Sequence, residues 1–159
     1  MSEERSCLVV LKTEDKFKAL EDIVKKSPLF EALDRNALLS SIIKREREQS
    51  TYIGHGVLIA HGRLKGLNDI KIALAISEEG ITGDREPIHL LFAIASPEEQ
   101  PTLYLKSISA ILSWVHNSDF RARLSRSDYK DKSVALFYKM LKSQHFTQYE
   151  ESHLSTHQC

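Results

Sequence analysis

The chain has 159 residues, of which 42% are hydrophobic and 28% are charged, and its formal net charge is zero. This composition is typical of one globular domain, and the neutral charge gives no general attraction to nucleic acid or anionic membranes. No apolar run is long enough to span a membrane, the acidic start lacks a signal segment, and Cys7 and Cys159 give no disulfide framework. We expect a reduced, cytoplasmic protein without membrane insertion or nucleic-acid binding.

The first third of the chain predicts a strand followed by two helices. Residues 7–10 are short, apolar and β-prone, which favours a strand. Thr13 is the expected cap of the first helix, which should end at Pro28. Asp34 is the expected cap of the second helix, which should end around residues 45–48.

The middle of the chain predicts several strands. Residues 57–60 favour a short buried strand, which places His61 at the strand end where the chain turns. Residues 63–69 favour a loop. Apolar residues alternate over 70–76, and residues 88–95 are almost entirely apolar, which indicates a central strand covered on both faces.

The last third predicts helices. The first of them follows two prolines, and its expected apolar stripe consists of Leu105, Ile108, Ile111, Leu112 and Val115. A short helix is expected around residues 119–124. A final helix is expected over 131–143. We therefore predict one α/β domain over residues 1–144, with a mixed β-sheet sandwiched between helices, and a polar, flexible tail over 145–159.

The most informative stretch is residues 51–63, TYIGHGVLIAHGR. Three glycines bracket His61, and glycine suits a turn that leaves a neighbouring side chain open. A histidine presented in this way can serve as a nucleophile or proton carrier near neutral pH. Arg45 lies 16 residues before His61. An arginine near a reactive histidine suggests that the substrate carries an anionic, phosphate-like group.

These residues resemble the enzyme IIA domain of the bacterial sugar phosphotransferase system, of the fructose/mannitol/nitrogen-regulatory type. The family pattern is an Arg-Glu pair, then Thr-x-Ile-Gly, then Gly-Ile-Ala-Ile-Pro-His-Gly/Ala. It matches Arg45-Glu46, residues 51–54 and residues 56–62, and residues 87–92 resemble the next family strand. The resemblance implies an α/β sandwich in which the motif histidine accepts a phosphoryl group from the carrier protein HPr or a paralogue.

The resemblance also implies a set of site residues. His61 would attack phosphorus through Nε2, and the guanidinium of Arg45 would neutralise the oxygens of the transferring group. We expect the rest of the phosphoryl site to be lined by His55, Thr51, Gly62 and Tyr104. No metal or other cofactor is implied, because donor and acceptor are both protein residues.

Two positions depart from the family pattern. Ala60 replaces the proline before the histidine, and Tyr104 replaces a second active-site histidine. Tyrosine can donate a hydrogen bond to a phosphoryl oxygen but carries no positive charge near neutral pH. We therefore expect slower transfer rather than none.

Three functions stay open at this point. The first is a free-standing, nitrogen-regulatory type phosphocarrier that takes its phosphoryl group from an HPr-type protein and signals to an unknown regulatory protein. The second is a degenerate enzyme IIA-like module that binds a regulator without transfer. The third is a soluble IIA subunit of a fructose- or mannitol-type permease.

Overall fold

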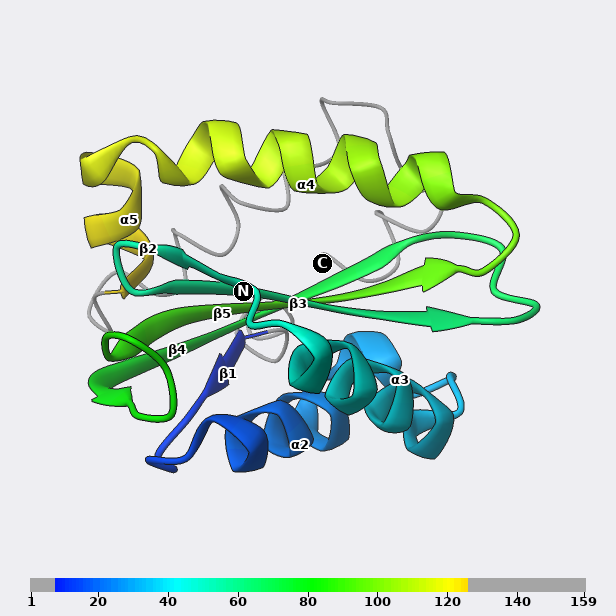
Figure 1. The fold of residues 1–159 in the computed structure, drawn as a ribbon, viewed down its shortest axis with the longest axis horizontal. Coiled ribbons are helices and arrows are strands. Elements are labelled where there is room, and N and C mark those ends of the chain that lie inside the picture. Colours follow the sequence, from blue (N-terminus) through cyan, green and yellow to red (C-terminus); the bar gives the residue numbers. More distant parts are fainter. Residues whose placement is uncertain (1–7, 126–159) are drawn as a thin grey trace.

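The computed structural model describes residues 8–125, which form a five-stranded mixed β-sheet between layers of helices (Figure 1). The strand order is β1-β4-β5-β3-β2. The strands are β1 (Leu8–Val10), β2 (Tyr52–Gly54), β3 (Val57–Leu64), β4 (Lys71–Ile81) and β5 (Ile88–Pro97). The helices are α2 (Lys16–Lys26), the 3₁₀ turn η1 (Pro28–Phe30), α3 (Arg35–Glu48), α4 (Pro101–Val115) and α5 (Ser118–Ser125). The predicted α/β sandwich is therefore confirmed.

Helices α2 and α3 cover one face of the sheet, and α4 runs across the other face (Figure 1). Each face has its own apolar core. Ile59 of β3 packs with Ile111 and Trp114 of α4, whereas Leu58 of β3 packs on the side of Leu38 of α3. Alternate side chains of β3 are thus buried on both faces, as expected for an apolar run in a central position.

Strand β5 lies at the centre of the sheet, parallel to β3 and antiparallel to β4. In the β3–β5 register His61 pairs with Ile94, and Arg63 pairs with Ser96. Side chains on one strand alternate between faces, so His61, Arg63, Ile94 and Ser96 all belong to the face covered by α4.

The helix starts follow from local capping. The Asp34 side chain accepts a hydrogen bond from the Ala37 N–H at 3.0 Å, which confirms Asp34 as the cap of α3. The cap of α2 is Asp15, which accepts from the Lys18 N–H at 2.9 Å. Thr13 was the expected cap, but it lies two residues before the actual cap. Its hydroxyl oxygen accepts a hydrogen bond from the Asp15 N–H.

Two further expectations were wrong. β3 does not end at Ala60 but continues through Leu64, because parallel pairing with β5 supplies hydrogen-bond partners along its whole length. His61 consequently lies within a strand rather than at a turn. Leu105 is 59% exposed, whereas Ile111 and Val115 of the expected stripe are buried together with Leu103 and Trp114. The helix expected over 131–143 and the tail over 145–159 lie outside the described residues.

Candidate functional site

His61 is buried between the sheet and the start of α4. Its side chain projects toward the α4 face of β3, and the residue is only 5% exposed. Its imidazole stacks on the ring of Tyr104, with the ring centroids 3.6 Å apart and the ring planes 8° from parallel. Tyr104 belongs to the first turns of α4. The structure therefore brings these two predicted site residues into direct contact.

The third member of this cluster is Ser96. Its Oγ lies 2.6 Å from Nε2 of His61, a short hydrogen bond between two buried groups. Ser96 comes two residues after Ile94, the strand partner of His61, and so shares its face of the sheet. Sequence reasoning missed Ser96, because this contact depends on the parallel register of β3 and β5.

The imidazole of His61 is neutral at physiological pH. Burial lowers the pKa of His61 to about 4, and the positive charges of Arg63 and Arg45 add to this effect. A neutral imidazole keeps one nitrogen lone pair, which is the form required of a nucleophile or of a hydrogen-bond acceptor.

Two arginines act on this cluster from separate elements. Arg45 comes from the last turn of α3, where its Nη1 donates to the Gln49 carbonyl at 2.8 Å. Arg63 follows His61 by two residues on the same face of β3. Burial raises the pKa of the Tyr104 hydroxyl, and the positive charges of Arg45 and Arg63 offset part of this rise. Both cations therefore lie close enough to act on His61 and Tyr104 alike.

Arg63 was not among the predicted site residues. The period of two along a strand would have indicated it, because residues two apart project to the same side. The prediction instead placed residues 63–69 in a loop, and so lost this signal.

The hydroxyl of Thr51 is hydrogen-bonded to Glu46 rather than to His61. The Thr51 hydroxyl donates to Oε1 of Glu46 at 2.6 Å, and the Thr51 N–H donates to Oε2 at 2.9 Å. Glu46 is buried and also accepts from Nζ of Lys16 at 3.0 Å. The two neighbouring residues of the Arg-Glu pair at the end of α3 thus have different roles. Glu46 ties α3 to the start of β2, while the neighbouring Arg45 acts on the histidine.

His55 lies far from His61. It occupies the tight turn between β2 and β3, with φ +57° between two glycines that also have positive φ. His55 precedes His61 by six residues along the chain. The part of this separation that lies in β3, from Val57 to His61, spans about 13 Å at the rise of an extended strand, and the turn places His55 beyond its far end. The structure does not bring His55 into the His61 cluster.

Gly62 sits where α3 crosses β3. A Cβ at this position would lie 2.8 Å from Cγ1 of Ile42 and 3.0 Å from Cδ1 of Leu38. Only glycine lets α3 pack this closely on the strand. This close approach also carries Arg45, which lies one turn after Ile42, toward the edge of β3.

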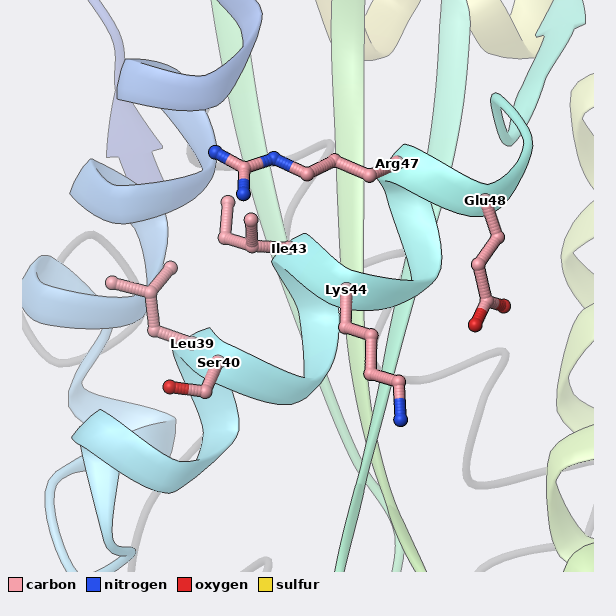
Figure 2. A pocket seen from close by; sticks show the side chains of 6 residues that line it. All are labelled: Leu39, Ser40, Ile43, Lys44, Arg47 and Glu48. Atoms are coloured by element: carbon pink, nitrogen blue, oxygen red, sulfur yellow. The ribbon is translucent and has the colours of Figure 1, made fainter.

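A separate groove lies on the outer side of α3 (Figure 2). It is lined by Leu39, Ser40, Ile43, Lys44, Arg47 and Glu48. Arg47 extends toward α2, where its guanidinium carbon lies 5.6 Å from the centre of the Phe17 ring. Neither His61 nor Arg45 lines this groove, so it is distinct from the histidine cluster.

His89 makes a structural hydrogen bond between two strands of the sheet. Its Nδ1 donates to the Ser77 carbonyl at 2.9 Å and so connects β5 to β4.

Over residues 8–125 no helix has both the length and the apolar character needed to cross a membrane.

Two proteins of known type are similar to this chain in sequence. A nitrogen regulatory protein of Bradyrhizobium diazoefficiens is 28% identical over 123 residues, which cover 76% of this chain and 80% of that protein. The fructose-specific EIIABC component of Bacillus subtilis is 29% identical over 104 residues, 64% of this chain. The match spans only 16% of that much longer component.

Solved structures agree in fold. The nitrogen regulatory protein IIA-Ntr of Neisseria meningitidis superposes with a TM-score of 0.68 at 20% identity, over 80% of this chain and 91% of that one. The IIA mannitol protein of Escherichia coli gives a TM-score of 0.65 at 15% identity, over 84% and 97% of the two chains.

The family described as "Phosphoenolpyruvate-dependent sugar phosphotransferase system, EIIA 2" matches residues 3–140, nearly the whole chain. The match includes the Arg45-Glu46 pair, the glycine-flanked His61 and the start of α4. This chain therefore belongs to the EIIA 2 family of the phosphoenolpyruvate-dependent sugar phosphotransferase system.

Proposed function

We propose that this chain is a nitrogen-regulatory type phosphocarrier. In this proposal His61 accepts a phosphoryl group from an HPr-type phosphohistidine protein, and the phosphorylation state of His61 is the signal read by a regulatory partner. The observation that carries the proposal is a buried, neutral imidazole within the field of two arginines. Membership of the EIIA 2 family and the similarity to nitrogen regulatory proteins support it.

The chemistry needs no group beyond the two proteins. The Nε2 lone pair of His61 attacks phosphorus, the N–P bond of the donor breaks, and its electron pair returns to the donor imidazole. A new N–P bond to His61 forms in the same step. Because such transfer depends on positioning and charge stabilisation, Arg45 and Arg63 have the matching role of neutralising the phosphoryl oxygens. The Tyr104 hydroxyl is a further donor beside the ring.

Phosphorylation would change the surface that a partner meets. A phosphoryl group brings nearly two negative charges to a cluster whose nearby charged side chains are arginines. The arginines would turn toward the new group, and Tyr104 would leave its stacked position to make room for it. A partner that distinguishes the two states would then read charge and shape together.

The test is phosphoryl transfer from a phosphorylated HPr-type protein, followed by intact mass. We expect wild-type protein to gain one acid-labile phosphoryl group, and His61→Ala to gain none. His55→Asn is the matched control, because His55 is an exposed histidine at the other end of β3 and asparagine tolerates its positive φ. This control should be labelled like wild type. Labelling of His61→Ala would overturn the site assignment.

A second candidate function is binding without transfer. The specific observation in its favour is that Tyr104 and Ser96 together leave His61 only 5% exposed. If no HPr-type donor labels the wild-type protein, this reading replaces the first. Partner binding would then be unaffected by phosphodonor.

A third candidate is a IIA subunit that serves a fructose- or mannitol-type permease. The fructose-specific relative of Bacillus subtilis favours it, as does a similar mannitol enzyme IIA of Escherichia coli, which was solved in complex with its phosphorylated enzyme IIB. Onward transfer from labelled protein to a purified IIB domain would distinguish this function from signalling alone.

A further inference from the structure

Ser96 is the polar side chain closest to Nε2 of His61, and it lies outside the sequence motif that surrounds His61. Its Oγ lies 2.6 Å from Nε2 of His61. We propose that Ser96 is a positioning residue that selects the tautomer of His61. Its hydroxyl donates to Nε2, which places the ring proton on Nδ1 and keeps the Nε2 lone pair for phosphorus.

The direction of this hydrogen bond follows from hydrogen-bond satisfaction. Ser96 is 1% exposed, and its only side-chain hydrogen bond to a described residue is the one to Nε2. If Nε2 carried the proton and donated, the serine hydroxyl proton would be left without an acceptor in a buried site. Leaving a buried donor unpaired is expensive, whereas an unused oxygen lone pair is cheaper. In the opposite arrangement the proton lies on Nδ1 of His61, which is not among the buried side-chain atoms without a partner in the described residues, so its N–H can donate to solvent. On this comparison the serine donates, and Nε2 accepts.

This choice opposes the intrinsic preference of the side chain. In water the neutral histidine imidazole prefers to carry its proton on Nε2, which leaves only Nδ1 as a nucleophile. A donor fixed beside Nε2 reverses that preference, because a hydrogen bond to one nitrogen sets the tautomer of the ring.

The sheet places the donor beside the imidazole. Ser96 belongs to the central strand β5, and its register opposite Arg63 holds its Cα in place. The His61 ring is held on one face by the stacked ring of Tyr104. The orientation of the imidazole is therefore determined by two contacts, one at its edge and one at its face.

Ser96 also has a role in the transfer step, and this role rests on the proposed function. When phosphorus approaches Nε2, the Ser96 hydroxyl must turn away from the lone pair. It then lies beside the new N–P bond, within reach of a phosphoryl oxygen to which it can donate. The serine would thus prepare the nucleophile before transfer and stabilise the phosphoryl group after it.

The decisive measurement is the tautomer of His61 in the unphosphorylated protein, read from its two ring ¹⁵N chemical shifts. Wild type should show Nδ1 protonated and Nε2 unprotonated. Ser96→Ala should shift the equilibrium toward Nε2–H. Ser107→Ala is the matched control, because Ser107 is also buried on this side of the sheet but its hydroxyl donates to the Leu103 carbonyl within α4. The control should retain the wild-type tautomer.

Phosphoryl transfer is measured separately on the same variants. We expect Ser96→Ala to be labelled about tenfold more slowly than wild type, the effect of one lost hydrogen bond to a charged group, and Ser107→Ala to match wild type. If no variant and no wild-type protein is labelled, the proposed function fails while the tautomer result stands. The inference is overturned if wild-type His61 carries its proton on Nε2, or if Ser96→Ala leaves the tautomer unchanged.

Discussion

The protonation of His61 is controlled by the residues that cover it. Burial is the main cause that lowers its pKa to about 4, and the stacked ring of Tyr104 supplies part of that burial. The resemblance described from the sequence implies a second family histidine at the position of Tyr104. A tyrosine here exchanges a group that can be charged for an uncharged ring, and so makes the site drier without adding positive charge.

Substitutions of Tyr104 test whether its ring, by covering His61, lowers the pKa of the imidazole. Tyr104→Ala should raise the pKa of His61 from about 4 toward the ordinary value of 6.5, because water reaches the imidazole. Tyr104→Phe keeps the stacked ring and should leave the pKa close to its wild-type value. The measurement is a proton NMR titration of the His61 ring. A pKa that stays near 4 in Tyr104→Ala would mean that the sheet and the arginines, rather than Tyr104, hold it down.

The sequence predicted the parts of this site that depend on local pattern. The spacing of Arg45 and His61 indicated their proximity, and the resemblance placed Tyr104 beside the histidine. His55 was assigned to the site because the family resemblance has a polar or acidic site-lining residue at this position. The segment of β3 from Val57 to His61 alone spans about 13 Å, and His55 lies beyond it in the turn. Ser96 stayed hidden because its contact arises from strand register, which no local pattern reveals.

At the scale of elements, a buried ionic cluster joins α2, α3 and the β4–β5 connection. Nζ of Lys16 lies 3.0 Å from Oε2 of Glu46 and 2.9 Å from Oδ2 of Asp84. Burial alone would lower the pKa of Lys16, but hydrogen bonds to Asp84 and Glu46 raise it on balance. The hydroxyl of Ser50 also donates to Asp84. The cluster therefore fixes the corner from which Arg45 reaches the site.

Removing the cation should loosen this corner. Lys16→Met leaves two buried carboxylates without their partner, which typically destabilises a fold by about 3–5 kcal/mol. Urea unfolding followed by circular dichroism measures this loss. Lys18→Met is the control, because Lys18 lies on the same helix but pairs with Glu21 at the surface, and it should shift the urea midpoint little. Equal midpoints for the two variants would contradict a structural role for the cluster.

Sequence patterns missed this cluster, and for the same reason they misjudged β3. Lys16 and Asp84 lie 68 residues apart and meet only when the sheet is assembled. Likewise β3 continues to Leu64 because β5 runs beside it, although the sequence after Ala60 contains His61, Gly62 and Arg63, a run without the apolar character of a buried strand. Long-range pairing decided both features.

For the molecule as a whole, the buried histidine links stability to pH. The pKa of His61 is about 4 in the folded protein and near the ordinary 6.5 in the unfolded chain. Between these values the unfolded chain binds more protons than the folded protein, so the free energy of unfolding rises with pH across this window. Acidification from pH 7 to pH 4.5 should therefore remove about 2–3 kcal/mol of stability through this one group.

The variant His61→Gln isolates the contribution, because glutamine is polar, similar in reach and does not titrate. Urea unfolding at pH 7 and pH 4.5 should show a larger loss on acidification for wild type than for His61→Gln. Asp84, whose pKa is lowered below the ordinary 3.8, changes the free energy of unfolding only at more acidic pH and so does not affect the comparison.

Tyr104→Ala should lose less stability than wild type on acidification, because the pKa of His61 in this variant is closer to its value in the unfolded chain. Tyr104→Phe should behave as wild type. Identical pH dependence in wild type and His61→Gln would show that His61 accepts its proton in the folded protein as readily as in the unfolded chain.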